Sequence, residues 1–197
     1  MTAPMAEVAA WCGVAPGPDT APRWNITPSQ EVTALTSDGV RRLRTMRWGF
    51  PGPKGPLINA RSERLAEAPT FRAAARERRC LIPVTAWYEW TNSEGRKLPW
   101  RVRARSGLLA LAGVWQGAED PAFAVVTRAA NKMLAPYHHR MPVIVAPEDF
   151  ALWLGEAGHG AARLMRPLPA DGLMIERVSE AVNAARFEGP VVALDEG

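Results

Sequence analysis

The alternation of apolar and polar positions predicts a chain built mainly of short strands. Residues 31–35 and 40–50 flank the turn sequence Ser37-Asp38-Gly39, and we expect a β-hairpin there. Residues 100–105 alternate apolar side chains with arginines, which predicts a strand with one basic, solvent-facing side. Continuous apolar runs at residues 80–90, 108–115, 123–127 and 142–145 predict buried strands, the first interrupted near Pro83.

Helical patterns are few and short. Residues 69–79 are rich in alanine and begin with Pro69, which suits a first helical turn. Residues 129–134 predict another short helix, and residues 147–154 predict a third that ends at Gly155. Residues 1–30 contain Ala, Pro and Gly in abundance, and their prolines favour an extended, loop-like segment. Many strands without regular strand–helix alternation predict a single α+β domain with a largely antiparallel, barrel-like sheet.

Composition excludes several classes of protein. The chain has 197 residues, of which 47% are hydrophobic and 22% charged, so one ordinary globular domain is expected. We find neither a long apolar run nor a signal-peptide pattern, and we therefore expect a cytoplasmic protein without membrane contact. Two cysteines and three histidines are too few for a disulfide framework or a structural zinc site, so no metal or cofactor is expected.

The charge is unevenly distributed along the chain. The net charge is +4, yet six cations and no acid lie between Asp38 and Glu63, and five cations and no acid lie between Glu94 and Glu119. Such runs favour a polyanionic partner, and Trp48, Trp90 and Trp100 beside them suit stacking on single-stranded bases. Solvated strand faces and core tryptophans would explain the same pattern equally well.

Few residues in the chain have the chemistry of a catalytic group. Cys12 precedes Gly13 in the predicted loop, where a thiol could be exposed, whereas Cys80 lies in an apolar segment and is expected to be structural. The pair His138-His139 stands before a predicted strand, a suitable place for a general base. His159 is expected to have no catalytic role.

Glu89 and Asn59 are the other candidates. Glu89 lies among aromatic residues, where desolvation would raise its pKa towards neutrality, although strand alternation could equally point it to solvent. Asn59 and Arg61 are two residues apart, so on a strand they share a face and could together hold a phosphate or an oxyanion.

Taken together and in order, these segments resemble one known family, the SOS-response-associated peptidase (SRAP) proteins that process abasic sites in DNA. The matching segments are Cys12-Gly13, Arg23-Trp24-Asn25-Ile26-Thr27-Pro28, Trp48-Gly49-Phe50, Asn59-Ala60-Arg61-Ser62-Glu63, Phe71-Arg72, Arg79-Cys80-Leu81-Ile82-Pro83, Trp87-Tyr88-Glu89-Trp90, Leu111-Ala112-Gly113-Val114-Trp115, Val126-Thr127, His138-His139-Arg140-Met141-Pro142 and, more weakly, Val182-Asn183.

The resemblance implies an SRAP-like fold and a protein of the DNA damage (SOS) response that binds single-stranded DNA as a monomer, in the cytoplasm and at the nucleoid. It implies a covalent crosslink in which the α-amine and thiol of an N-terminal cysteine close a thiazolidine with the abasic aldehyde. Carried over by motif, Cys12 would be the nucleophile, with Asn59, Glu89 and His138 assisting. Those carried over as DNA-binding residues are Asn25, Pro28, Trp48, Arg61, Trp90, Thr127 and Arg140.

Cys12 differs from the family pattern because eleven residues precede it. The crosslinking hypothesis therefore requires cleavage, by autoproteolysis or otherwise, after Trp11. It divides the chain into a removable extension, residues 1–11, and a domain, residues 12–197. Two alternatives remain open: a diverged protein that binds single-stranded or damaged DNA without covalent chemistry, and a cysteine peptidase that uses Cys12, His138 and Asn59 or Glu89.

Overall fold

The structure, a computed structural model, describes residues 1–166 and 172–194. Its strands are β1 (Glu31–Ser37), β2 (Arg41–Trp48), β3 (Asn59–Arg61), β4 (Arg79–Val84), β5 (Ala86–Ser93), β6 (Arg96–Ala104), β7 (Leu109–Gln116), β8 (Ala122–Ala129), β9 (Arg140–Pro142), β10 (Ile144–Val145) and β11 (Leu173–Arg177). Its helices are α1 (Met5–Cys12), α2 (Arg72–Glu77) and α3 (Phe150–Leu154), with short 3₁₀ turns at η1 (Ser62–Arg64), η2 (Pro147–Asp149), η3 (Ala161–Leu164) and η5 (Glu180–Asn183).

The larger sheet closes on itself. Within the described chain, β7, β4, β1, β2 and β8 form a closed ring, because β8 pairs with β2 on one side and with β7 on the other. Pairing around the ring is antiparallel except between β2 and β8, and β3 adds a second parallel partner to β8. Closure gives each ring strand a partner on both sides along part of its length. The expected α+β fold with a barrel-like, largely antiparallel sheet is confirmed.

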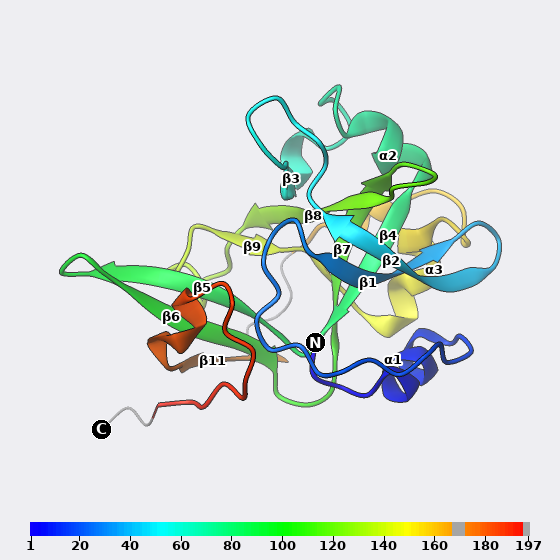
Figure 1. The fold of residues 1–197 in the computed structure, drawn as a ribbon. Helices are drawn as coiled ribbons and strands as arrows, with labels where there is room; N and C mark the ends of the chain where they lie inside the picture. The colour runs from blue at the N-terminus through cyan, green and yellow to red at the C-terminus, as the bar shows by residue number, and fades with distance from the viewer. Residues whose placement is uncertain (167–171, 195–197) are drawn as a thin grey trace.

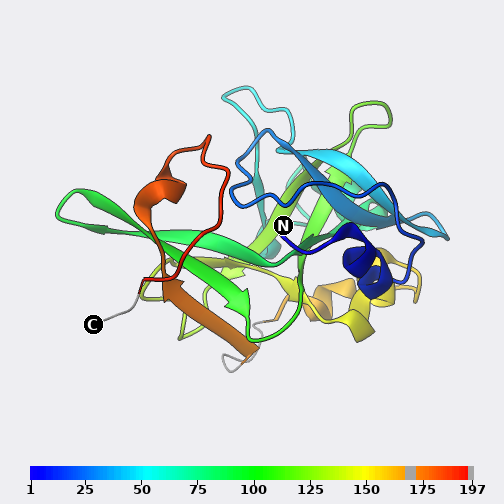
Figure 2. The same ribbon diagram turned by 60° about the horizontal axis from the view of Figure 1, so that its bottom comes forward.

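A smaller sheet stands beside the ring. Strands β5, β6 and β11 form an antiparallel sheet whose β5–β6 hairpin extends away from the ring in both ribbon views (Figures 1 and 2). Helices α1 and α3 lie at the opposite side of the molecule in the same views. The ring therefore has helices near one side and a second sheet near the other.

Alternate residues of the ring strands contribute to two separate apolar clusters, as strand periodicity requires. Ala112 and Val114 of β7 pack in the cluster that contains Val8 of α1 and Trp153 of α3. Leu111 of the same strand packs in the second cluster, towards the small sheet. The molecule therefore has a helix-side core and a sheet-side core, separated by the strands of the ring.

Most predicted strands are confirmed, including the 31–50 hairpin and the buried runs of β7 and β8. In the 80–90 run, residues 80–83 are buried as predicted, whereas β5 has no fully buried residue. The 80–90 run is two strands that separate at Thr85. Pro83 is tolerated inside β4 because only β7 pairs with it there, while β1 pairs with Leu81 and Cys80. The predicted helix at residues 69–79 is the shorter α2, and the one ending at Gly155 is present as η2 and α3.

Two local predictions are wrong. Residues 1–30 are not all extended, because α1 forms before the proline-rich part and ends at Gly13 in the left-handed conformation (φ 71°). Residues 129–134 are not a helix: β8 continues to Ala129, and the chain then turns at residues 132–137. There the side chain of Asn131 accepts a hydrogen bond from the Leu134 N–H at 2.9 Å, a local bond that competes with a helix.

Candidate functional site

A pocket of about 620 Å³ opens between the ring and the small sheet. Its floor consists of apolar ring residues such as Val32, Ile82 and Leu111, and its walls come from β3, β5, residues 24–28 and residues 182–185. Ten of the eleven residues expected to form a site line it: Asn25, Pro28, Trp48, Asn59, Arg61, Glu89, Trp90, Thr127, His138 and Arg140. The fold therefore gathers residues that lie far apart in sequence around one cavity.

Glu89 and His138 form the titratable pair in this pocket. The Glu89 side chain is 14% exposed, and its Oε2 lies 3.5 Å from His138 Nδ1. Its Oε1 accepts a hydrogen bond from the Trp87 indole at 3.2 Å. Burial raises the pKa of Glu89 above its usual value of 4.5, and the nearby imidazole and indole oppose that rise. Of the two orientations considered for Glu89, the structure shows the one that faces the pocket.

Arg140 is held tightly beside this pair. Its Nη1 and Nη2 donate to the two carboxylate oxygens of Glu63 at 2.7 and 2.8 Å, and Nη2 also donates to the Thr127 carbonyl at 2.6 Å. The ion pair lowers the pKa of Glu63 to about 2. The positive charge of Arg140, which lines the pocket, is therefore matched by the carboxylate of Glu63.

Asn59 and Arg61 share one face of β3, as their spacing predicted. Both are exposed, while Ala60 between them is buried. In the parts of the chain that the structure describes, Arg61 has no hydrogen-bond or ion-pair partner, in contrast to Arg140. Arg61 is therefore a cation at the pocket that is available to an anionic ligand.

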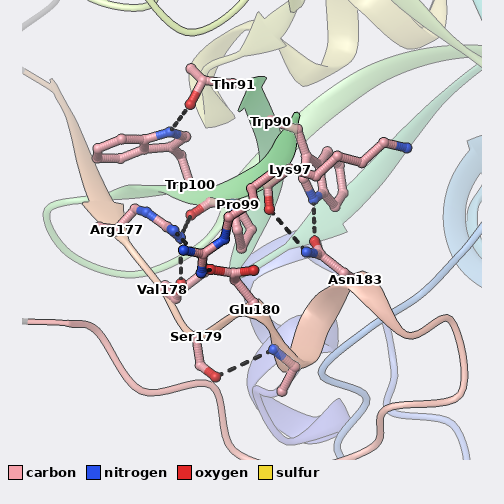
Figure 3. A network of polar contacts seen from close by, with 12 residues as sticks. Trp90, Thr91, Lys97, Pro99, Trp100, Arg177, Val178, Ser179, Glu180 and Asn183 are labelled. Atoms are coloured by element: carbon pink, nitrogen blue, oxygen red, sulfur yellow. Dashed lines mark hydrogen bonds and ion pairs between the residues drawn. The ribbon is translucent and has the colours of Figure 1, made fainter. Parts of the chain in front are cut away.

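The aromatic residues of the site differ in exposure. Trp48 stacks on Phe123 and donates to the Ile58 carbonyl at 3.0 Å, so it is part of the wall. Trp90 is 40% exposed, and its indole donates to Asn183 Oδ1 at 2.7 Å. Figure 3 shows Asn183 between that indole and the Lys97 carbonyl, to which its amide donates. Of the two, Trp90 presents a ring to solvent.

Asn25 has a structural place in the site. It is buried, and its amide donates to the carbonyls of Val182 and Ala184, which ties residues 24–28 to the segment around η5. These two segments, the first of which includes Pro28, form one wall of the pocket.

Cys12 is not part of this group. It is the last residue of α1, is 1% exposed and packs in the helix-side core, whereas the buried ring residues that line the pocket belong to the sheet-side core. Burial raises the pKa of its thiol to about 11, against a smaller opposing effect of Arg41. The predicted exposed loop position is therefore corrected to a buried helix position.

Two contacts at the pocket were not expected from the sequence. Glu63 belongs to the segment Asn59-Ala60-Arg61-Ser62-Glu63, but its ion pair with the pocket residue Arg140 depends on the closeness of β3 and β9 to β8. Met1 also lines the pocket, and its amino group donates to the Arg23 carbonyl at 2.7 Å. Burial lowers the pKa of that amino group to about 6. No sequence pattern indicated that residue 1 would reach the pocket.

No group of three or more His, Cys, Asp or Glu residues suited to a metal ion occurs among residues 1–166 and 172–194. Over the same residues, no helix has the length and apolar character needed to cross a membrane.

Several known proteins are similar to this chain over most of its length. The abasic site processing protein YoqW of Bacillus subtilis is 31% identical over 188 residues, covering 86% of this chain and 84% of its own. The abasic site processing protein YedK of Escherichia coli is 29% identical over 186 residues, covering 87% and 84%. A crystal structure of a Bacteroides thetaiotaomicron protein shares the fold, with a TM-score of 0.74, 21% identity and coverage of 93% and 92%. A family model described as SOS response associated peptidase (SRAP) matches residues 1–185, and the chain therefore belongs to the SRAP family.

Proposed function

We propose that this protein processes abasic sites in single-stranded DNA at the pocket between the ring and the small sheet. The observation that carries the proposal is the pair of Glu89 and His138, 3.5 Å apart in a pocket bordered by Arg61 and Trp90. The relatives YoqW and YedK are both named abasic site processing proteins, which supports the same substrate.

The rim of the pocket suits an unpaired strand. Arg61 offers an unmatched positive charge to a phosphate, and the exposed face of Trp90 offers a stacking surface to a neighbouring base. A nucleotide that lacks its base presents only a sugar, which a pocket of about 620 Å³ can admit beside Glu89. Recognition then rests on entry of the sugar rather than on reading of a base.

The paired acid and imidazole suit the opening of that sugar. An abasic sugar is a cyclic hemiacetal in equilibrium with an aldehyde. In its ionised form, Glu89 takes the proton of the C1 hydroxyl, the C1–ring oxygen bond breaks, and the same proton goes to the released C4 oxygen. We assign to Asn59 a hydrogen bond to the sugar and to His138 a share of the proton held by Glu89, since all three residues line the pocket.

The positions of the possible nucleophiles favour this account over a crosslink through Cys12. A thiazolidine requires an α-amine and a thiol on one residue, but the nitrogen of Cys12 is a peptide nitrogen inside α1 and its thiol is buried away from the pocket. Cleavage after Trp11 would also remove Met5, Val8 and Ala9, which are buried, from the core. A peptidase that uses Cys12 with His138 is disfavoured for the same reason.

The test compares three labelled oligonucleotides: single-stranded with one abasic site, single-stranded and intact, and duplex with one abasic site. The protein is expected to consume the aldehyde of the first, by adduct formation or strand cleavage, and to leave the intact strand unchanged. Slower reaction of the duplex is expected. If the abasic and intact strands react equally, the proposed function is contradicted. Binding of the abasic strand without consumption of its aldehyde would favour the non-covalent alternative. Peptide mapping of any adduct, with and without borohydride reduction, identifies the residue attached.

A further inference from the structure

Glu63 has a role that none of the motifs assigned. We propose that Glu63 is a positioning residue, which acts through Arg140 to hold the His138 imidazole against Glu89. This inference rests on the proposed function only for its effect on rate, because the orientation of His138 can be measured without any substrate.

Glu63 and Arg140 are joined directly through their side chains. Glu63 lies in η1, directly after β3, and Arg140 begins β9. Their contact is bidentate, with Oε1 to Nη1 at 2.7 Å and Oε2 to Nη2 at 2.8 Å. Paired contacts of this kind fix the plane of the guanidinium as well as its distance.

The guanidinium of Arg140 is also connected to β8, a strand of the ring. Nη2 of Arg140 also donates to the Thr127 carbonyl on β8, and Arg140 pairs through its backbone with Ala129. The side chain and the main chain of Arg140 are therefore both anchored to β8. Glu63 completes the anchor from the opposite side of β8, where β3 pairs.

The backbone of Arg140 contacts the imidazole of His138. His138 Nδ1 lies 2.9 Å from the Arg140 carbonyl oxygen and 3.3 Å from the Arg140 backbone nitrogen. The same nitrogen faces Glu89 Oε2 at 3.5 Å. Since a single residue supplies both backbone contacts, a change in the position of Arg140 changes the orientation of the ring.

The segment before His138 is anchored separately. Tyr137 packs edge-on against Trp100 with ring centroids 4.6 Å apart, and Leu134 is buried. His138 thus stands between an apolar anchor on one side and the Glu63–Arg140 pair on the other. Loss of the pair releases one side only, so the chain keeps its fold while the imidazole loses its fixed orientation.

Charge gives a second reason to assign a positioning role to Glu63. Glu63 matches the charge of Arg140, whereas Arg61, two residues earlier, has no partner within the described residues. Arg61 is the better placed cation for a phosphate. The two terminal nitrogens of Arg140 are engaged with Glu63 and Thr127, and only its Nε has no partner within the described residues.

The experiment compares Glu63→Gln with Glu67→Gln. The glutamine at position 63 keeps one acceptor for Arg140 but sets an amide N–H₂ against the other N–H donor, so one arm of the contact is lost. Glu67 is an exposed acid on the following turn and carries the same change in charge. Thermal melting of both variants checks folding. Glu63→Asp, which keeps the charge on a shorter side chain, is expected to retain part of the wild-type His138 orientation and rate.

The first readout is the nitrogen NMR spectrum of the histidine rings, with the His138 signal assigned through His138→Gln. Glu63→Gln should shift the His138 ring nitrogens, while Glu67→Gln should leave them in place. The second is the single-turnover rate on abasic single-stranded DNA at saturation, which should fall between about tenfold and a hundredfold in Glu63→Gln without weaker DNA binding. Unchanged His138 signals in folded Glu63→Gln would overturn the inference. If the wild-type protein does not consume abasic sites, the proposed function fails and the NMR result still decides the role of Glu63.

Discussion

At the scale of single residues, the surroundings of the thiols decide what chemistry they can perform. A thiol attacks as its thiolate, and burial keeps Cys12 protonated by raising its pKa to about 11. Cys80 is buried as well, and its pKa is also raised. Neither side chain is a ready nucleophile in the folded protein.

Alkylation by iodoacetamide at pH 8, followed by mass spectrometry, tests the reactivity of Cys12 and Cys80. In the native protein both thiols should react far more slowly than in urea, because the reagent needs both access and a thiolate. The denatured chain is the internal control, since it should take up two labels. Rapid uptake of one label by the native protein, lost in Cys12→Ala, would show that Cys12 is accessible and reactive after all.

The raised pKa of Glu89 predicts how the rate of abasic-site consumption depends on pH. Desolvation raises its pKa, so the carboxyl gains its proton at a higher pH than the usual value of 4.5. Because the ionised form is needed to take the sugar proton, the rate of abasic-site consumption should fall as pH decreases through this raised pKa. Glu89→Gln should lower the rate by about a hundredfold or more and abolish that acid limb. A Glu89→Gln protein that keeps the acid limb of the wild type would assign it to another group.

Residue-level predictions succeeded where strand geometry alone decided the outcome. The two-residue spacing of Asn59 and Arg61 placed both on one exposed face. For Glu89, the strand pattern left a desolvated and a solvent-facing carboxylate equally open, and the contact with Trp87 in the pocket decides between them. Cys12 was misplaced because the exposure of a thiol depends on what packs over it, here α1 against the helix-side core. Nothing local to the sequence contains that information.

At the scale of elements, α1 shows how a short helix can be held by packing rather than by its own stability. It has eight residues, no side-chain hydrogen bond at its N-cap and a glycine C-cap. Helices of this length are marginal in isolation. Its buried face, which includes Met5, Val8 and Ala9, packs on the ring, and Trp11 lies edge-on against Phe150 of α3.

A substitution in α1 tests this packing. Val8 is fully buried, and Val8→Ala should lower the free energy of unfolding by about 2 kcal/mol because it leaves a cavity. Glu7→Ala on the exposed face is the matched control and should have little effect. Urea unfolding followed by tryptophan fluorescence measures both. Equal stability of the Val8→Ala and wild-type proteins would mean that α1 is dispensable, as a removable extension requires.

The predicted elements that proved correct are those with a strong period or a fixed turn. The hairpin around Gly39 and the apolar runs of β7 and β8 are examples. The segment at residues 129–134 failed because β8 gains pairing with β9 up to Ala129, and strand pairing then outweighs the helical preference of alanine. Tertiary partners of this kind are not visible in a local pattern.

At the scale of the whole molecule, strand pairing on both edges of β8 and the small sheet beside the ring assemble the pocket. Asn59, Thr127 and Arg140 come together because β3 and β9 both pair with β8. Glu89 arrives from the separate small sheet, across the pocket. Sequence order gives no measure of these approaches, and among the residues around the pocket only Asn59 and Arg61 were related to each other by their spacing.

The basic runs have a different meaning in the fold than in the sequence. In the described chain, seven of their eleven cations form ion pairs: Arg41, Arg42, Arg44, Arg47, Arg96, Arg101 and Arg103. The acids that match them come partly from the acidic C-terminal quarter, as Glu156, Glu176 and Glu180 do. The charge of the runs is therefore largely neutralised within the fold, whereas Arg61 keeps an unmatched charge at the pocket.

The most direct measurement of the central claim is the rate at which wild-type, Cys12→Ala and Asn59→Ala proteins consume the aldehyde of a single-stranded abasic oligonucleotide, each first shown to be folded. If the pocket performs the reaction, Cys12→Ala should retain the wild-type rate and Asn59→Ala should lose most of it. If Cys12→Ala is inactive while Asn59→Ala is not, the reaction belongs to the cysteine, and the assignment of function to the pocket is contradicted.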